Sequence, residues 1–172
     1  VTGAGAAIIG NSGESPYISK ATVGKIVDLG IKDVNNMGAA MAPAAAKTML
    51  SFFEDTKTHP SEYDMIFSGD LGEVGSNLLR DLLLKESYRL GDNYNDCGLM
   101  IYNKEEQDVH AGGSGCGCSA SVFCSLISRK LKEKTWNNVL FMATGALMSP
   151  TSCQQGETIP GVAHLINIKN DL

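Results

Sequence analysis

The chain has 172 residues and a formal net charge of −5, from 14 basic and 19 acidic side chains. Apolar residues make up 43 % of it, which is enough for one buried core, and the length fits one domain or part of a larger one. The charged fraction of 19 % is too low for a disordered acidic tail. The acidic balance and the absence of lysine and arginine clusters argue against nucleic acid as a partner.

Two further features concern the membrane and redox chemistry. No apolar run reaches the roughly 18 residues of a membrane span, and the N-terminus lacks the basic region of a secretory signal. We therefore expect no transmembrane segment. Five cysteines, an odd number, argue against a disulfide framework.

The N-terminal third of the chain predicts two strands and a helix. Residues 3–10 are a short apolar run bounded by glycines, which is typical of a buried strand. The β-branched residues within 17–29 predict a second strand, paired with the first. Residues 33–36 supply candidate helix caps, and Pro43 is expected in a first helical turn, where its missing N–H costs little. Small and apolar side chains then recur at helical spacing, at Ala44, Ala45, Thr48, Met49, Phe52 and Phe53.

The rest of the chain alternates strands and helices. The first predicted elements are a strand over 65–67, a helix with apolar residues from Val74 to Leu83, and a short element over 97–102. A helix from Cys118 follows, and then a buried strand over 139–143 that ends in a turn at Gly145. A loop over 150–152 and a closing strand over 162–168 complete the chain order. Such alternation predicts an α/β fold, a layered sheet with covering helices. We find no second domain boundary and expect residues 1–172 to form a single domain.

The most distinctive stretch is residues 107–120, which contains Gly112-Gly113-Ser114-Gly115 ahead of a predicted helix. Glycines let backbone N–H groups approach a ligand, and a helix N-terminus carries a partial positive charge, so this loop suits a carboxylate or a phosphate. It matches neither the GxGxxG nor the GxxxxGK[ST] pattern. Close packing of a helix on the sheet explains the glycines equally well, and both interpretations stay open.

His110 lies just before this loop, where an imidazole could donate to an anionic ligand or act as a base. A lone histidine is more often a hydrogen-bonded structural residue, which is the alternative. Of the other two histidines, we expect His59 to be solvated in a polar loop and His164 to lie inside the last strand.

Two polar positions follow predicted strands. Asp70 lies in a Gly-Asp-x-Gly turn after the strand over 65–67, and Thr151 and Ser152 follow the strand over 139–143. Open α/β sheets place ligands at the carboxyl ends of their strands, so Asp70 and Thr151 are candidate ligand-binding residues. Simple turn formation is the alternative for Asp70.

Cys116 and Cys118 form a CxC pair at the start of the predicted helix. This spacing differs from the usual CxxC of zinc ligands and no second cluster follows, so we expect no metal site. Cys116 near a helix N-terminus is a candidate reactive thiol. The local sequence places no base near it, so packing as a small apolar residue is the favoured interpretation.

Five segments of the chain carry a family resemblance: Gly3-Ala4-Gly5-Ala6-Ala7, Asp33 through Gly38, Phe67 through Gly72, Gln107 through Ala120, and Thr144 through Ser152. Together they resemble the stage V sporulation protein AD family, which is itself similar to thiolases and β-ketoacyl synthases. The run VHAGGSGCGCSA is the most specific of them. The resemblance spans nearly the whole chain and corresponds to the C-terminal half of that family.

This resemblance implies a fold of two similar βαβαββ halves packed in five layers, of which the chain would be one half. In thiolase-like enzymes the nucleophilic cysteine lies in the other half, and this half supplies His or Asn groups. By position those groups would fall at residues 68–70 and 112–114, where the sequence has neither His nor Asn. Gly and Ser do not act as a base or stabilise an enolate as His does, so the resemblance implies binding rather than catalysis.

The implied ligand is dipicolinic acid (pyridine-2,6-dicarboxylate), free or as its calcium chelate, which is taken up into the developing spore. A flat dianion needs backbone N–H donors, a helix N-terminus and a cationic His at the floor of an apolar cleft. The expected ligand-binding residues are His110, Gly112, Gly113, Ser114, Asp70 and Thr151. We expect no cofactor, and no dedicated protein calcium site, because no Asp-x-Asp-x-Asp-Gly loop occurs.

The implied partners are the N-terminal half of the same protein, membrane proteins of the same sporulation operon, and a second copy of the chain. The implied location is the forespore, on its inner membrane and without spanning it. Two alternatives stay open. One is a thiolase-type or ketoacyl-synthase-type acyltransferase or thioesterase, motivated by Cys116 and His110. The other is a scaffold that docks on membrane partners through apolar residues within 44–53.

Overall fold

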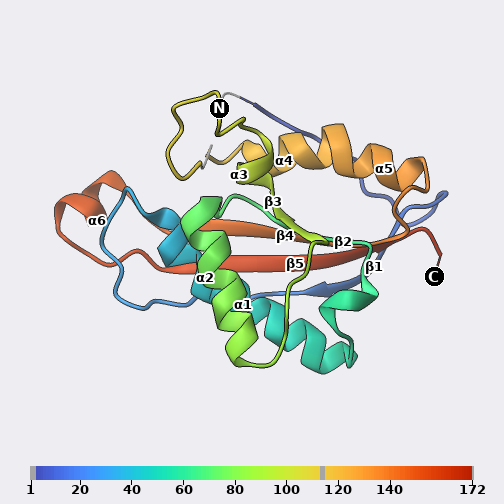
Figure 1. Ribbon diagram of the computed structural model, residues 1–172, viewed down its shortest axis with the longest axis horizontal. Coiled ribbons are helices and arrows are strands. Elements are labelled where there is room, and N and C mark those ends of the chain that lie inside the picture. The colour runs from blue at the N-terminus through green and yellow to red at the C-terminus, as the bar shows by residue number, and fades with distance from the viewer. Residues whose placement is uncertain (1–2, 113–114, 172) are drawn as a thin grey trace.

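A mixed five-stranded sheet forms the centre of the molecule in the computed structural model, which describes residues 3–112 and 115–171 (Figure 1). The strands are β1 (Tyr17–Thr22), β2 (Met65–Ser68), β3 (Tyr94–Asp96), β4 (Asn138–Ala146) and β5 (Gly161–Lys169), in the spatial order β1-β5-β4-β2-β3. β2 runs parallel to β3 and β4, while β5 runs antiparallel to β1 and β4. The predicted α/β class is confirmed.

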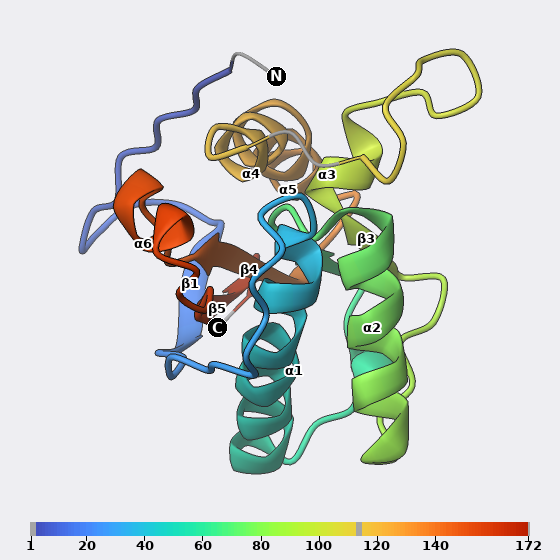
Figure 2. The same cartoon turned by 90° about the vertical axis from the view of Figure 1, so that its left-hand side faces the viewer.

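Helices cover both faces of this sheet. They are α1 (Met37–Thr56), the 3₁₀ turn η1 (Pro60–Glu62), α2 (Gly72–Lys85), α3 (Cys97–Met100), α4 (Cys118–Val122), the π-helical turn η2 (Phe123–Ile127), α5 (Ser128–Lys132) and α6 (Pro150–Gln154). α1 and α2 lie on one face, and α4, η2 and α5 follow one another without a break on the other (Figures 1 and 2). Among the helices of the described residues, none has both the length and the apolar character of a membrane span.

β2 shows how the sheet divides the core into two layers. Ile66 and Phe67 are adjacent and both fully buried, because successive side chains of a strand point to opposite faces. Ile66 packs with Phe53 and Leu79 from α1 and α2, whereas Phe67 belongs to the layer under α4 and α5, with Ile127. The strand therefore reads as an unbroken apolar run rather than as an alternating one.

α1 begins earlier than the sequence predicts. Asn36 is the N-cap, and its side-chain oxygen accepts a hydrogen bond from the Ala39 N–H at 3.3 Å, so a cap within 33–36 is confirmed. Pro43 consequently lies inside the helix, and its expected place in the first turn was wrong. The residues predicted at helical spacing, from Ala44 to Phe53, are all buried, as expected.

The predicted strand over 3–10 is wrong. This segment is extended but unpaired, and Ile8 is fully exposed. It crosses the helix of residues 118–132 instead, where Gly5 lies against the Ala120 carbonyl and the Ala6 carbonyl accepts a bond from Cys124 Sγ at 3.6 Å. β1 pairs with β5 and not with this segment. An apolar run indicates a strand only if a neighbour is available to pair with it.

The C-terminal part of the chain differs from the prediction in two places. β4 continues through Gly145, which pairs with Val162, so the turn expected at Gly145 was wrong. The loop expected at 150–152 is instead the short helix α6, which Ser149 caps by accepting a bond from the Ser152 N–H at 3.1 Å. The strands predicted over 65–67, 139–143 and 162–168 are confirmed.

A pair of neighbouring leucines in α2 tests this packing. Leu83 is fully buried and Leu84 is 57 % exposed. We expect Leu83→Ala to lower the free energy of unfolding by about 2–5 kcal/mol, because it leaves a cavity between α1, α2 and the sheet. Leu84→Ala should change it by less than about 0.5 kcal/mol. Urea denaturation followed by circular dichroism measures both, and equal losses would contradict the assignment of these faces.

Candidate functional site

A buried carboxylate lies at the carboxyl end of the parallel strands. Asp96 ends β3, caps α3 and is fully buried. Its Oδ1 accepts hydrogen bonds from Ser68 Oγ at 2.5 Å and the Leu71 N–H at 2.9 Å. Its Oδ2 accepts from the Gly72 and Gly98 N–H groups, both at 3.0 Å. One side chain thus joins the end of β2, the start of α2 and the start of α3.

The surroundings of Asp96 shift the pKa of its carboxyl group. Burial raises the pKa of the Asp96 carboxyl above its ordinary value, and the bonds from Ser68, Leu71 and Gly72 oppose that rise. Tyr94 lies next to it, with its hydroxyl 2.7 Å from Ser68 Oγ, and burial raises the pKa of Tyr94 to about 12. The sequence analysis did not single out Asp96. The local signal was weak, because β3 has only three residues.

Asp70 and the glycine loop, predicted separately, lie together. Asp70 follows β2, its N–H donates to Thr144 Oγ1 at 3.1 Å, and its Oδ2 accepts from the Gly115 N–H at 2.7 Å. The loop is held on its other side by the Ala111 carbonyl, which accepts from the Glu73 N–H at 2.7 Å. Gly112 follows directly, with a positive φ of 76° that favours glycine.

Two predicted site residues, Gly113 and Ser114, lie outside the described residues, so the loop is characterised here by the residues on either side of them. The strand-end argument that selected Asp70 from the sequence nonetheless places it at this loop, through its bond to Gly115.

The remaining predicted site residues point elsewhere. The His110 side chain is 89 % exposed, with Nδ1 3.6 Å from Asp108 Oδ1 in a polar loop. Thr151 is exposed in α6, which lies away from α3 in both views (Figures 1 and 2). The structure therefore brings together Asp70 and the residues flanking the loop, Gly112 and Gly115, but neither the His110 imidazole nor Thr151.

The cysteines differ in their surroundings. Cys116 is exposed at the start of the helix of residues 118–132, while Cys97 and Cys118 are buried. Burial, with the nearby Asp96 charge, raises the pKa of the Cys97 thiol, so Cys97 is not a thiolate nucleophile at neutral pH. Among the cysteines of the described residues, Cys116 alone is exposed.

Comparison with known proteins identifies the family. The family profile of stage V sporulation protein AD matches residues 1–169. The chain belongs to the stage V sporulation protein AD family. It is 50 % identical over 164 residues to stage V sporulation protein AD of Bacillus subtilis (strain 168), a match that covers 95 % of this chain and 48 % of that protein. The resemblance seen in the motifs is thereby confirmed, and the chain spans about half the length of this relative.

A pair of aspartates tests the structural role of Asp96 within this family member. Asp96→Asn keeps the shape but replaces one carboxylate oxygen with an NH₂ group, which does not accept. In either orientation of the amide at least one buried backbone N–H loses its acceptor, that of Leu71 or those of Gly72 and Gly98. We expect a loss of at least about 2 kcal/mol in the free energy of unfolding. Asp64 is the matched control, because it also accepts two backbone N–H bonds, from Asn137 and Asn138, but is exposed. Asp64→Asn should cost about 1 kcal/mol or less by urea denaturation. Equal costs would contradict the role of burial.

Proposed function

We propose that the protein of which this chain is a part binds dipicolinic acid without converting it and serves to load it into the developing spore. The observation that carries the proposal is the Asp70–Gly115 bond. The resemblance to thiolase-like enzymes implies that their His or Asn groups would fall at residues 68–70 and 112–114. The first of these segments contains Asp70, whose carboxylate is bonded to the loop, and the second begins with Gly112. Neither position supplies a neutral base, so a role in binding fits the chain better than carbanion chemistry.

The ligand in this proposal is the calcium chelate rather than the free dianion. The chain carries a net charge of −5, and Asp70 adds a negative charge at the loop itself. A doubly charged anion would be repelled by both. Calcium cancels the charge of the dicarboxylate and favours carboxylate oxygens as neighbours. The Asp70 side chain therefore supports a site for the neutral chelate.

Backbone groups support the same reading. The loop leads into a helical segment, formed by α4, η2 and α5, that runs without interruption from Cys118 to Lys132. The N-terminus of this segment, which carries a partial positive charge, therefore faces the loop. Carboxylate oxygens on a planar ligand are suited to such N–H donors. In this proposal Asp70 sets the position of the loop and the helix start binds the ligand.

Calorimetric titration of the full-length protein tests the proposal. We expect saturable heat with dipicolinate plus calcium, and at least tenfold weaker binding of dipicolinate alone. Asp70→Asn keeps an acceptor for Gly115 and removes one charge, so it should raise the affinity for the free dianion roughly tenfold without raising that for the chelate. Asp81→Asn, an exposed change on α2, is the control and should alter neither. No heat at millimolar chelate from a folded protein would overturn the proposal.

An acyltransferase or thioesterase is the second candidate, because the Cys116 thiol is exposed beside a helix start. Incubation of the full-length protein with an acyl thioester, followed by peptide mass spectrometry, distinguishes the two functions. A binding protein is expected to stay unmodified. An acyl group located on Cys116, and lost in Cys116→Ser, would favour the enzyme.

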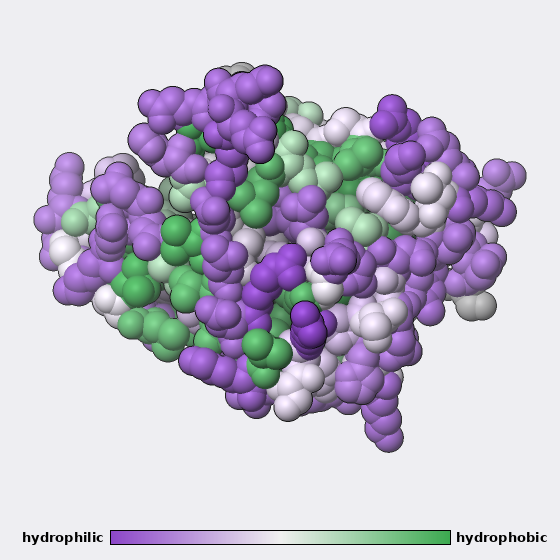
Figure 3. All heavy atoms as spheres, viewed as in Figure 1, coloured by the Kyte–Doolittle hydropathy of each residue, from purple (hydrophilic) through white to green (hydrophobic). Residues whose placement is uncertain are grey.

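The proposal includes association with other chains. Apolar side chains are exposed in the N-terminal part of the molecule, at Ile8, Ile9, Val23, Ile26 and Leu29. Figure 3 shows further apolar atoms at the surface at the end that carries α6 and the start of α1. Such surfaces mark interfaces, and we propose that they meet the other half of the same protein, a second copy, and membrane proteins of the forespore inner membrane.

Sedimentation velocity tests the association. We expect the 172-residue chain to self-associate at micromolar concentration, and the double variant Ile8→Asn, Ile9→Asn to weaken that association. Leu84→Asn, an exposed leucine on α2, is the control and should leave it unchanged. A monomer for the unmodified chain at all concentrations would contradict the proposed interface.

A further inference from the structure

Residues 3–6 form a strap across the helix of residues 118–132 (Figure 1). A Cβ placed on Gly5 would be 2.2 Å from the Ala120 carbonyl oxygen and 2.9 Å from Cys124 Sγ, so the strap backbone rests directly on the helix and only glycine fits. Among the described residues, the bond donated by Cys124 Sγ is the single hydrogen bond that joins the strap to the rest of the chain. The strap is thus held by its shape, and little else opposes its release.

The strap also reaches the turn that carries the proposed ligand site. A Cβ placed on Gly117 would be 2.0 Å from the Gly3 carbonyl oxygen, so the strap touches the residue directly before the helix. This turn begins at Gly115, whose N–H donates to Asp70, and the Gly115 carbonyl accepts from the Cys118 N–H at 3.1 Å. One side of the turn is therefore fixed by a carboxylate, and the other is covered by the strap.

The helix beneath the strap is not a regular α-helix. The π-helical turn η2 begins one residue before Cys124, and π turns are rare and frequently lie at functional sites. Ser121 Oγ donates to the Gly117 carbonyl at 2.8 Å. Ser128 Oγ donates in the same way, four residues back, to the Cys124 carbonyl at 2.9 Å. Such bonds bend helices and weaken them slightly, so the stretch that touches the strap is easier to deform than a regular α-helix.

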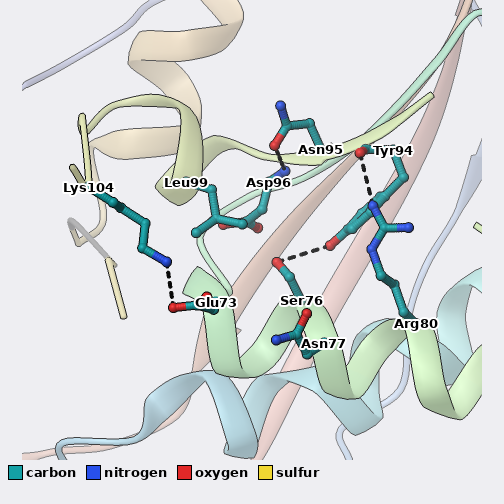
Figure 4. A pocket seen from close by; sticks show the side chains of 9 residues that line it. All are labelled: Glu73, Ser76, Asn77, Arg80, Tyr94, Asn95, Asp96, Leu99 and Lys104. Atoms are coloured by element: carbon teal, nitrogen blue, oxygen red, sulfur yellow. Dashed lines mark hydrogen bonds and ion pairs between the residues drawn. The ribbon is translucent and has the colours of Figure 1, made fainter. Parts of the chain in front are cut away.

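The other opening at this edge of the sheet does not suit a charged ligand. A hollow of about 320 Å³ lies between α2 and residues 94–104, with Arg80 on one side and the ion pair of Glu73 and Lys104 on the other (Figure 4). Arg80 donates to three backbone carbonyls, and the buried Asp96 carboxylate balances its charge. The charges that line the hollow cancel in pairs. The helix start beneath the strap is therefore the better place for the proposed ligand.

We infer that the strap is a positioning element of the proposed ligand site, and that binding of calcium dipicolinate at the helix start locks residues 3–6 in their seat. The inference rests on the proposed function and adds a moving part to it. A segment with one hydrogen bond exchanges between seated and released states, because packing alone offsets the conformational entropy lost on seating. A ligand bound at the turn favours the state in which Gly117 is held in place, which is the seated state.

The thiol of Cys124 reports on the position of the strap. It is partly buried and touches the strap in the seated state. Cys153 is also partly buried, but it lies in α6, which Figure 1 shows well apart from the start of the chain. Modification of a thiol requires access to it. The rate at which iodoacetamide modifies Cys124, relative to Cys153, therefore measures how often the strap is released.

The experiment combines this modification, read by peptide mass spectrometry on the full-length protein, with calorimetric titration of calcium dipicolinate. In the unmodified protein we expect the chelate to slow modification of Cys124 at least fivefold and to leave Cys153 unchanged. A residue with a purely structural role would not give protection that depends on the ligand.

Two glycines of the same segment supply the matched variants. Gly5→Ala places a methyl group against the Ala120 carbonyl, so it should release the strap. We expect Cys124 to be modified at least tenfold faster in this variant, and the chelate to bind at least fivefold more weakly. Gly10→Ala is the control, because Gly10 is exposed and its added Cβ would be 3.3 Å from the nearest atom. It should change neither quantity.

The outcomes separate the inference from the proposed function. Equal rates of Cys124 modification in Gly5→Ala and the unmodified protein would overturn the inference, and so would equal affinities for the chelate. Chelate protection of Cys124 needs no variant, and its absence in a protein that binds the chelate would overturn the inference alone. No heat from the unmodified protein at millimolar chelate would overturn the proposed function, and with it the inference.

Discussion

The Asp96 carboxylate is the interaction on which the carboxyl edge of the sheet depends. Removal of a carboxylate from water costs several kcal/mol, and only well-placed donors offset that cost. Asp96 has four, from one hydroxyl and three backbone N–H groups. Two of those N–H groups belong to Leu71 and Gly72 at the start of α2, where an unpaired donor would itself be costly. The carboxylate and the chain ends therefore satisfy each other.

This arrangement positions the glycine loop and the hollow beside it. The turn that Asp96 fixes contains Asp70, whose carboxylate accepts from Gly115, and continues into Glu73, whose N–H binds the Ala111 carbonyl. The glycine loop thus rests on one side of the first turn of α2. The hollow that contains Arg80 lies on its other side, with the Glu73–Lys104 pair between them (Figure 4). A change at Asp96 should therefore affect both the glycine loop and the hollow.

The sequence predicted the elements whose signals are local. Apolar spacing located α1 and α2, unbroken apolar runs located β2 and β4, and the rule that ligands lie at strand ends selected Asp70, which does contact the glycine loop. The predicted strand over 3–10 was wrong because an apolar pattern carries no information about a pairing partner. The predicted place of Pro43 in the first helical turn was wrong because the helix begins earlier, after its cap at Asn36. Asp96 and Arg80 were missed because their partners are brought together only by the fold: Asp96 binds residues of β2 and α2, and Arg80 binds carbonyls ten to fourteen residues away.

Amide hydrogen exchange, measured by NMR for the Leu71, Gly72 and Gly98 N–H groups, tests the central role of Asp96 most directly. If the buried carboxylate holds these three donors, they should exchange as slowly as the amides in the middle of β4, since opening them requires loss of the fold at that edge. Exchange as fast as that of the exposed loop over 103–108 would contradict the account.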